Sequence, residues 1–205
     1  DLLSINMGIK SDYSNIIGAK DNALSLKPIS EINITVNTIW DFNMKNPENK
    51  IVLIGAGAAG VEVSLAIRNK LNKLNLNNNI ILISRNNNIL KNYNNRTRKI
   101  FKNELRKNNI NILYNINIKS IHKDYILYNK NSKIYCKFPI LATSGSPINT
   151  LKKSNLPLNK KGSIIIENSL LVEKTNDIFA TGDIAEINKH KTPKAGVFAV
   201  KQGRI

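Results

Sequence analysis

The chain contains very little cysteine. Of its 205 residues only Cys136 is a cysteine, so no internal disulfide can form. The lack of a second thiol excludes a disulfide scaffold, a Cys-x-x-Cys redox pair and any zinc site made of several cysteines. A reducing, cytoplasmic setting is therefore expected. Cys136 lies in an alternating Tyr-Cys-Lys-Phe segment and is predicted to be a small buried residue.

Long hydrophobic runs and histidine are also scarce. No stretch of about 18 apolar residues occurs, which argues against a membrane-spanning helix. The first residues, Asp1 to Ser4, lack an initiator Met and the basic start of a signal peptide, so they are not expected to be the true start. His122 and His190 have no partner at metal-ligand spacing, so no metal site is predicted.

Acidic residues are few, with 14 Asp and Glu against 31 Lys and Arg, and the net charge is +17. Such an excess raises affinity for polyanions in general. The lysines are spread along the whole chain, however, and no aromatic-interleaved basic motif of an RNA-binding sheet is present. Asn, Ile and Lys, which A/T-rich codons specify, make up 91 of the 205 residues. We therefore attribute much of the charge to compositional bias and expect no specific nucleic-acid partner.

The pattern of apolar residues predicts an α/β fold. Four β-favouring residues over 51–54 are typical of a buried parallel strand, and a helix is expected after the glycines that follow. Further elements are expected as a strand over 80–84, a helix over 93–108 and a strand over 111–114. Ile100, Phe101 and Leu105 are predicted to face inward from that helix. This order is the mononucleotide-binding half of a Rossmann-like, doubly wound sheet.

Two changes of pattern predict domain boundaries. Short stretches with Asn/Lys turns over 116–138 indicate an antiparallel β-meander, and residues 139–143 indicate a returning buried strand before an exit turn. On the other side, a helix expected over about 29–44 is broken by Pro47. We therefore predict an NAD(P)-binding domain over 47–147, inserted into an incomplete second domain formed by residues 1–46 and 148–205.

The glycines after the first strand match Gly-x-Gly-x-x-Gly. The first permits a tight turn, the second lets the backbone approach a pyrophosphate and the third allows close packing of the helix. The helix that begins near Ala58 offers free N–H groups and the positive end of its dipole to a diphosphate. The predicted dinucleotide-binding segment is Gly55, Ala56, Gly57, Ala58, Ala59 and Gly60.

The end of the second strand is where a Rossmann-like domain contacts the adenosine ribose of its dinucleotide. An acidic residue there would accept hydrogen bonds from the adenosine ribose, but this chain has Ser84 and Arg85. Arg85 suits a 2′-phosphate and therefore NADPH. Alternatively Ser84 and backbone groups bind the ribose, and Arg85 is solvated. The sequence leaves these two interpretations open.

The later part of the chain carries a family resemblance. The segment 177–185 contains an Ala-Thr-Gly-Asp turn after a strand, and residues 193–203 read Pro-Lys-Ala-Gly-Val-Phe-Ala-Val-Lys-Gln-Gly. With the upstream glycine motif, these segments resemble the FAD-dependent pyridine nucleotide-disulfide oxidoreductase superfamily of two-dinucleotide-binding-domain flavoproteins. Within it they are most similar to type II NADH dehydrogenase-like oxidoreductases fused to selenide, water dikinase. The segments at 1–8 and 26–29 are also similar to that group, so the resemblance covers nearly the whole chain.

The resemblance implies roles for further residues. It places Asp183 on the FAD ribityl and pyrophosphate, and a helix beginning near Ala195 at the flavin N1/C2 edge. It implies that Glu62 lies near the nicotinamide, although a first-turn glutamate favoured by the helix dipole is the alternative. The cofactor-contacting residues implied in this way are Glu62, Gly145, Gly182, Asp183, Lys194, Ala195, Gly196 and Val197.

The chain also departs from the family pattern. The redox-active cysteine pair is absent, which excludes disulfide reduction, and the usual Ala-Thr-Gly crossing turn has Ser144 inserted before Gly145. The family's first, FAD-binding glycine motif has no counterpart here. We therefore expect the middle and late portion of a longer protein.

The expected function is that of a flavin-dependent NAD(P)H oxidoreductase that transfers a hydride from NAD(P)H to FAD and passes electrons to an acceptor such as a quinone. No side chain is expected to perform acid–base catalysis, because the cofactors carry the reactivity. A fused or associated selenide, water dikinase and a peripheral position on the inner membrane face are further expectations. The alternatives are a non-catalytic dinucleotide-binding module linked to selenophosphate synthesis and a truncated remnant.

Overall fold

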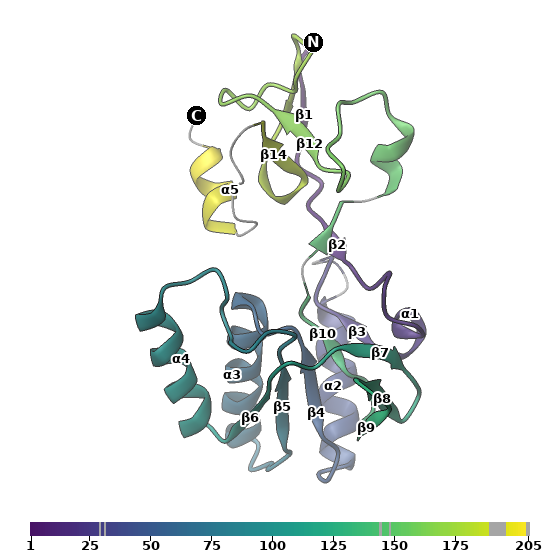
Figure 1. Ribbon diagram of the computed structural model, residues 1–205, viewed down its shortest axis with the longest axis vertical. Helices are drawn as coiled ribbons and strands as arrows, with labels where there is room; N and C mark the ends of the chain where they lie inside the picture. Colours follow the sequence, from purple (N-terminus) through teal and green to yellow (C-terminus); the bar gives the residue numbers. More distant parts are fainter. Residues whose placement is uncertain (29, 31, 144, 148, 189–195, 204–205) are drawn as a thin grey trace. The chain divides into compact units, whose positions relative to one another are not determined.

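The computed structural model describes residues 1–28, 30, 32–143, 145–147, 149–188 and 196–203. The chain divides into two compact units, which are drawn in Figure 1. Unit 1 combines residues 1–10 with 145–205, and unit 2 is the continuous segment 11–144. One continuous segment is thus inserted between the two parts of a discontinuous unit.

The observed division differs from the expected boundary between residues 46 and 47. In unit 2, β3 (Leu24–Ser25) pairs in parallel with β10 (Ile140–Leu141). The helix α2 (Ile32–Lys45) buries Ile39 in the same core as the glycine-preceding strand. Residues 11–46 therefore fold with unit 2, because their hydrogen bonds and apolar side chains go to its sheet. At the other end, the division after residue 144 lies close to the expected limit at 147.

Unit 2 is built on a five-stranded parallel sheet in the order β3-β10-β4-β5-β6. The three central elements of the predicted pattern are β4 (Ile51–Ile54), β5 (Ile80–Ile83) and β6 (Ile110–Leu113), connected by α3 (Ala58–Lys73) and α4 (Asn95–Lys107). Every residue of β4 and β5 is buried, as expected for strands covered on both faces. The predicted α/β class with a Rossmann-like parallel sheet is confirmed.

The two faces of this sheet are covered differently. Alternate strand residues such as Leu53 and Leu82 pack under α2, α3 and α4. Their neighbours Val52 and Ile54 pack against α1 (Ala19–Asn22) and an antiparallel meander of β7 (Ile118–Ile121), β8 (Tyr125–Tyr128) and β9 (Ser132–Tyr135). Cys136 is 4% exposed in this second core, which confirms its predicted burial. Burial raises the pKa of its thiol to about 12, and the charge of Lys50 opposes the rise.

One expectation for α4 is wrong. Leu105 is fully buried and Phe101 packs against the core, but Ile100 is 56% exposed. The helix covers the outermost strand, β6, so only a narrow stripe of it meets other residues. Its first turn is secured by Asn94, whose side chain accepts a hydrogen bond from the Thr97 N–H at 2.8 Å.

Unit 1 contains short parallel pairs around its own core. β1 (Leu3–Ile5) pairs with β13 (Ile178–Ala180), and β12 (Ile164–Ile166) pairs with β14 (Ala185–Ile187). The other described elements are the paired strands β2 (Lys10–Ser11), whose second residue belongs to unit 2, and β11 (Gly145–Ser146), the 3₁₀ helices η2 (Asn149–Lys153) and η3 (Gly182–Ile184), and the helix α5 (Gly196–Gln202). The core is aliphatic and includes Ile164, Ile166 and Val172, all with 0% exposure.

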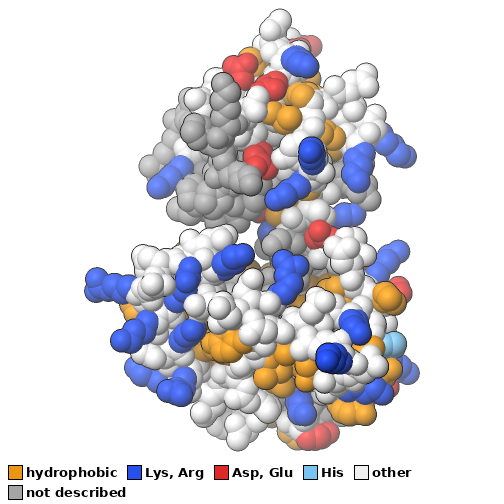
Figure 2. Space-filling view, viewed as in Figure 1, with side chains coloured by type: hydrophobic (Ala, Val, Ile, Leu, Met, Phe, Trp, Pro, Cys, Tyr) orange, Lys and Arg blue, Asp and Glu red, His pale blue; other side chains and the backbone are white. Residues whose placement is uncertain are grey.

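Two surface properties follow from the described residues. No helix in the described ranges has both the length and the apolar character needed to cross a bilayer. On the face shown in Figure 2, Lys and Arg side chains are scattered over both units and acidic side chains are few. The excess positive charge is therefore distributed over this face.

Candidate dinucleotide-binding site

The turn between β4 and α3 requires glycine at its first position. Gly55 has a φ of +117°, and a Cβ there would lie 2.6 Å from the carbonyl oxygen of Ala142. Its N–H donates to the Ile83 carbonyl at 2.9 Å, which ties the turn to the next strand. Both the backbone conformation and the close approach of Ala142, the residue that follows β10, exclude a side chain.

Gly60 permits the first turn of α3 to pack against this same turn. A Cβ at Gly60 would lie 1.8 Å from the carbonyl oxygen of Gly55, far inside any real contact, and 3.4 Å from the Ala142 side chain. The third glycine of the motif therefore allows the helix to pack closely against the turn, as the sequence predicts. It brings the amino end of α3 close to the end of β4.

Gly57 has a different environment. It is the N-cap of α3 in an extended conformation, and no heavy atom lies within 4 Å of the position of its missing Cβ. No side chain caps the helix. Within the described structure, the N–H groups of Ala58 and Ala59 donate to no protein acceptor outside their own helix, and its first residues have no i−4 partner within it. The helix thus presents unsatisfied donors and the positive end of its dipole to open space, which is the arrangement that binds a diphosphate.

The loop after β5 is attached to the glycine turn. The Leu90 N–H donates to the Ala56 carbonyl at 2.8 Å, and Leu90 adopts a φ of +50°. Arg98 on α4 fixes this segment, because its Nε donates to the Leu90 carbonyl and its Nη2 to the Lys91 carbonyl at 2.6 Å. Sequence reasoning missed Leu90 and Arg98, since a backbone bond made by a leucine with positive φ leaves no sequence signal.

Ser84 and Arg85, at the end of β5, differ in their availability to a ligand. Ser84 is 2% exposed, and its Oγ donates to the Asn88 carbonyl at 2.8 Å and accepts from the Asn86 N–H. The hydroxyl therefore shapes the loop. Arg85 is exposed, and no hydrogen bond or ion pair to a described residue engages its guanidinium. Glu62 is likewise exposed, in the second turn of α3.

The predicted site residues of unit 1 lie on a separate set of turns. Gly182 has a φ of +75°, and its N–H donates to Oε1 of Gln202 on α5 at 3.1 Å. Asp183 follows it, partly buried, in η3. Gly145 lies in β11, where a Cβ would lie 2.3 Å from Cδ1 of Ile9.

The remaining predicted residues of unit 1 are at or near α5. Gly196 and Val197 open this helix. Lys194 and Ala195 lie outside the described residues. Gly55, Ala56, Gly57, Ala58, Ala59, Gly60, Ser84 and Arg85 belong to unit 2, and Gly145, Gly182, Asp183 and Gly196 belong to unit 1. Nowhere in the described chain do three or more His, Cys, Asp or Glu residues form a metal-binding group.

The glycine turn, the parallel sheet and the inserted unit agree with a comparison to protein families. The sequence profile of the pyridine nucleotide-disulphide oxidoreductases matches residues 5–203. The chain belongs to this family. The predicted family is therefore confirmed, as are FAD and NAD(P)H as the cofactors of the family. A search of curated protein sequences gives no match.

Solved structures share the fold of this oxidoreductase family member. A water-forming NADH oxidase from Lactobacillus brevis, bound to NADH, is 20% identical with a TM-score of 0.80, and the match covers 99% of this chain and 44% of that one. An NAD-dependent persulfide reductase from A. fulgidus is 21% identical with a TM-score of 0.79, covering 100% and 38%. NDH2 from Plasmodium falciparum in complex with NADH is 24% identical with a TM-score of 0.74, covering 91% and 44%. The chain thus spans less than half the length of these three proteins.

Proposed function

We propose that unit 2 binds NAD(P)H at the turn between β4 and α3, as part of a flavin-dependent NAD(P)H oxidoreductase. The observation that carries this proposal is the amino end of α3 at Gly57. It has no side-chain cap and has open space at the glycine Cα. A dinucleotide diphosphate would accept hydrogen bonds from the N–H groups of Ala58 and Ala59 there. Family membership over residues 5–203 supports the same assignment.

The end of β5 favours NADPH over NADH. The Ser84 hydroxyl is already engaged by Asn88 and Asn86, whereas the Arg85 guanidinium is exposed. A guanidinium forms strong, charge-assisted hydrogen bonds with a phosphate. We assign Arg85 to the 2′-phosphate of NADPH. Glu62 is assigned to the nicotinamide side of the site, because it is exposed on α3 one turn beyond the diphosphate donors.

FAD is the hydride acceptor in this proposal, and when bound it supplies the redox chemistry. The described residues of unit 1 fit only part of such a molecule. They provide the Gly182-Asp183 turn and the start of α5, but the Gly182 N–H is already donated to Gln202. The sequence has a single Gly-x-Gly-x-x-Gly motif, and it lies in unit 2. FAD binding therefore rests on the family, and the roles of Gly145, Lys194, Ala195 and Val197 stay predictions.

The proposal also names the molecule that accepts electrons from the reduced flavin. A quinone is proposed because NDH2 is among the structural neighbours, and the links to selenide, water dikinase and to a membrane surface stay predictions. Among this chain's own groups, the α3 donors and Arg85 bind and orient the dinucleotide. Orientation is the main contribution a protein makes to hydride transfer between two cofactors.

The test uses the native protein purified from its source without denaturation. Its absorbance in the flavin band is recorded anaerobically before and after one equivalent of NADPH, with NADH in a parallel sample. The proposal predicts a yellow protein that NADPH bleaches within the turnover time of an oxidoreductase. Bound flavin that neither dinucleotide bleaches would contradict it and favour a non-catalytic dinucleotide-binding module.

A further inference from the structure

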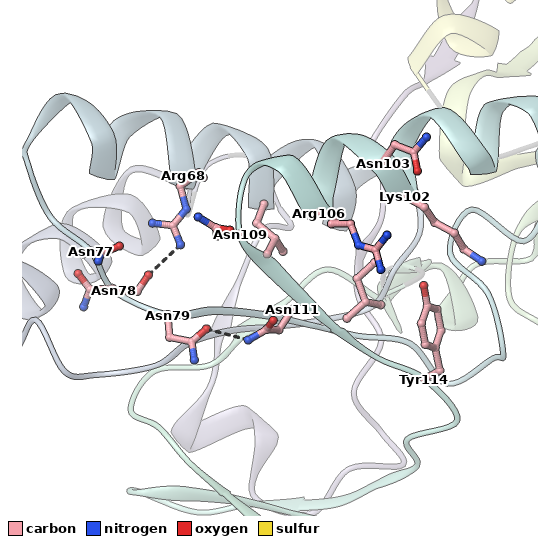
Figure 3. Close-up of a pocket in the computed structure, with 12 residues that line it drawn as sticks. Arg68, Asn77, Asn78, Asn79, Lys102, Asn103, Arg106, Asn109, Asn111 and Tyr114 are labelled. Carbon is pink, nitrogen blue, oxygen red and sulfur yellow. Dashed lines mark hydrogen bonds between the residues drawn. The ribbon is translucent and has the colours of Figure 1, made fainter.

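A polar cavity lies in unit 2, at the free edge of the parallel sheet. It is a groove of about 730 Å³ between α4 and β6, which is the outermost strand (Figure 3). Its wall contains three cationic side chains, Arg68, Lys102 and Arg106, and no Asp or Glu. The groove includes Asn79 and Asn109, which precede β5 and β6. It therefore runs along β6 from Asn109, just before its amino end, to Tyr114, just after its carboxyl end.

Arg68 is the most informative residue of this groove. Its side chain comes from α3 and is 6% exposed. Nε donates to the Asn108 carbonyl and Nη2 to the Asn78 carbonyl, each at 3.0 Å. Burial lowers the pKa of the guanidinium, because the charged form loses hydration. No Asp or Glu in the described part of the chain pairs with it.

A buried charge held only by carbonyl dipoles is costly unless an opposite charge comes close. Glu104, the one acidic residue of α4, does not supply that charge. Its carboxylate accepts from the Asn108 side chain, and it is not part of the groove wall. An anion in the groove would supply the missing negative charge next to Arg68.

The other two cations extend the positive charge along the groove. Lys102 and Arg106 are four residues apart on α4, so they lie on one face with Cβ atoms about 5–6 Å apart. Figure 3 shows Arg68, Arg106 and Lys102 in that order along the cavity. At the far end, Lys102 Nζ lies 5.4 Å from the ring centroid of Tyr114. Successive cations along one groove match a linear anion with several charges.

Uncharged hydrogen-bonding groups line the same groove. The Asn111 side chain donates to Oδ1 of Asn79 at 3.2 Å, which leaves the Asn79 amide N–H groups for a ligand. The Tyr114 hydroxyl is a further donor, and burial raises its pKa because the charged form would lose hydration. These donors suit phosphate oxygens.

We propose that the groove between α4 and β6 binds a linear oligophosphate, with Arg68 at its buried end and Arg106 and Lys102 along the chain of phosphates. The shared chemistry is a triphosphate, which an inorganic oligophosphate and a nucleoside triphosphate both provide. The groove shares no lining residue with the glycine turn or with Arg85, and in this proposal its occupant does not take part in hydride transfer. It is consequently a second anion site in the protein.

The experiment titrates sodium tripolyphosphate, and separately ATP, into the full protein by calorimetry at fixed ionic strength. All titrations are repeated in the Gly57→Val background, which disables the proposed dinucleotide site. The groove predicts saturable one-to-one binding that survives Gly57→Val. Lys102→Gln and Arg106→Gln should each weaken it about ten-fold or more, because each removes a charge-assisted hydrogen bond. Lys99→Gln, an exposed residue of the same helix outside the groove, is the matched control.

The outcomes separate the possibilities. Equal affinities for the two ligands support the phosphate chain as the recognised group, and tighter ATP supports a nucleoside triphosphate that also contacts Tyr114. The proposal fails if binding is not saturable, if Lys99→Gln weakens it as much as Arg106→Gln, or if it disappears with Gly57→Val. It also fails if a single-stranded oligonucleotide, or vesicles of anionic phospholipid, bind more tightly through the same residues. Arg68 is left unchanged, since its loss would take these donors from the buried Asn78 carbonyl and the partly buried Asn108 carbonyl.

Discussion

Replacing Gly57 with valine should strongly weaken dinucleotide binding and leave the fold intact. A side chain at this position would not clash with the rest of the protein, because no heavy atom lies within 4 Å of the missing Cβ and the backbone is extended. The valine methyl groups would instead occupy the space through which a diphosphate reaches the amino end of α3. The substitution therefore separates a ligand-related role from a structural one.

The size of the effect follows from the donors that the diphosphate would lose. The N–H groups of Ala58 and Ala59 would each form a hydrogen bond with an anionic oxygen, worth about 1.5–3 kcal/mol. Two such bonds correspond to a loss of roughly 10²- to 10⁴-fold in affinity. The cost in stability is only about 1 kcal/mol, because valine is a poorer N-cap than glycine.

The assay is a titration of NADPH and NADH by intrinsic or nicotinamide fluorescence, with urea unfolding of the same samples. Gly203→Val is a matched control in unit 1, where the nearest atoms to a new Cβ lie at 3.8 Å. We expect the free energy of unfolding of Gly57→Val to lie within about 1 kcal/mol of the parent value, while its dinucleotide affinity falls. Unchanged affinity for both dinucleotides in a folded Gly57→Val protein would show that the diphosphate does not bind at the amino end of α3.

Further predictions concern three other residues of unit 2. Arg85→Ala should weaken NADPH about ten-fold and leave NADH nearly unchanged, so equal losses in the two titrations would reject the 2′-phosphate assignment. Gly60→Ala should destabilise unit 2 by about 3 kcal/mol or more in urea unfolding, since its Cβ would lie 1.8 Å from the Gly55 oxygen. Cys136 should resist thiol reagents at pH 8 until the protein unfolds, because burial raises its pKa to about 12. The unfolded thiol ionises at lower pH than the native one, so stability should fall as pH rises from about 9 to 12, and Cys136→Ala should remove that part of the pH dependence.

The central elements of unit 2 could be predicted because their sequence signals are local. Residues 51–54 and 80–83 are continuous aliphatic runs, and the structure buries all of them. Gly55 and Gly60 could be assigned as structural because the motif spacing specifies a turn and a close helix approach, and the structure shows both. Strand, turn and helix follow one another directly there, so no long-range information is needed.

The amino-terminal limit of unit 2 was predicted at residue 47 but lies at residue 11, because the contacts that set it are between residues remote in sequence. β3 has two residues, and it pairs with β10 more than a hundred positions later. A two-residue strand has no detectable periodicity. Residues 11–46 therefore gave no local sign that they complete the sheet of unit 2.

Side-chain availability was the least predictable part of the site. Ser84 and Arg85 were equal candidates for the ribose side, and only the geometry of the loop shows that the Ser84 hydroxyl is engaged by Asn88 and Asn86. The exposure of Ile100 has a similar origin, because helical periodicity identifies an apolar stripe without its width. Both depend on which neighbours the fold supplies.

The most direct test of the dinucleotide site is a backbone amide NMR titration of the protein with NADPH. A dinucleotide bound at the amino end of α3 should cause saturable shifts that are largest at Gly57, Ala58 and Ala59, with a second group at Arg85 and its neighbours. These are the donors at the amino end of α3 and the residues at the end of β5. Shifts that leave the Gly55 to Gly60 turn unchanged while other amides respond would show that NADPH does not bind at this turn.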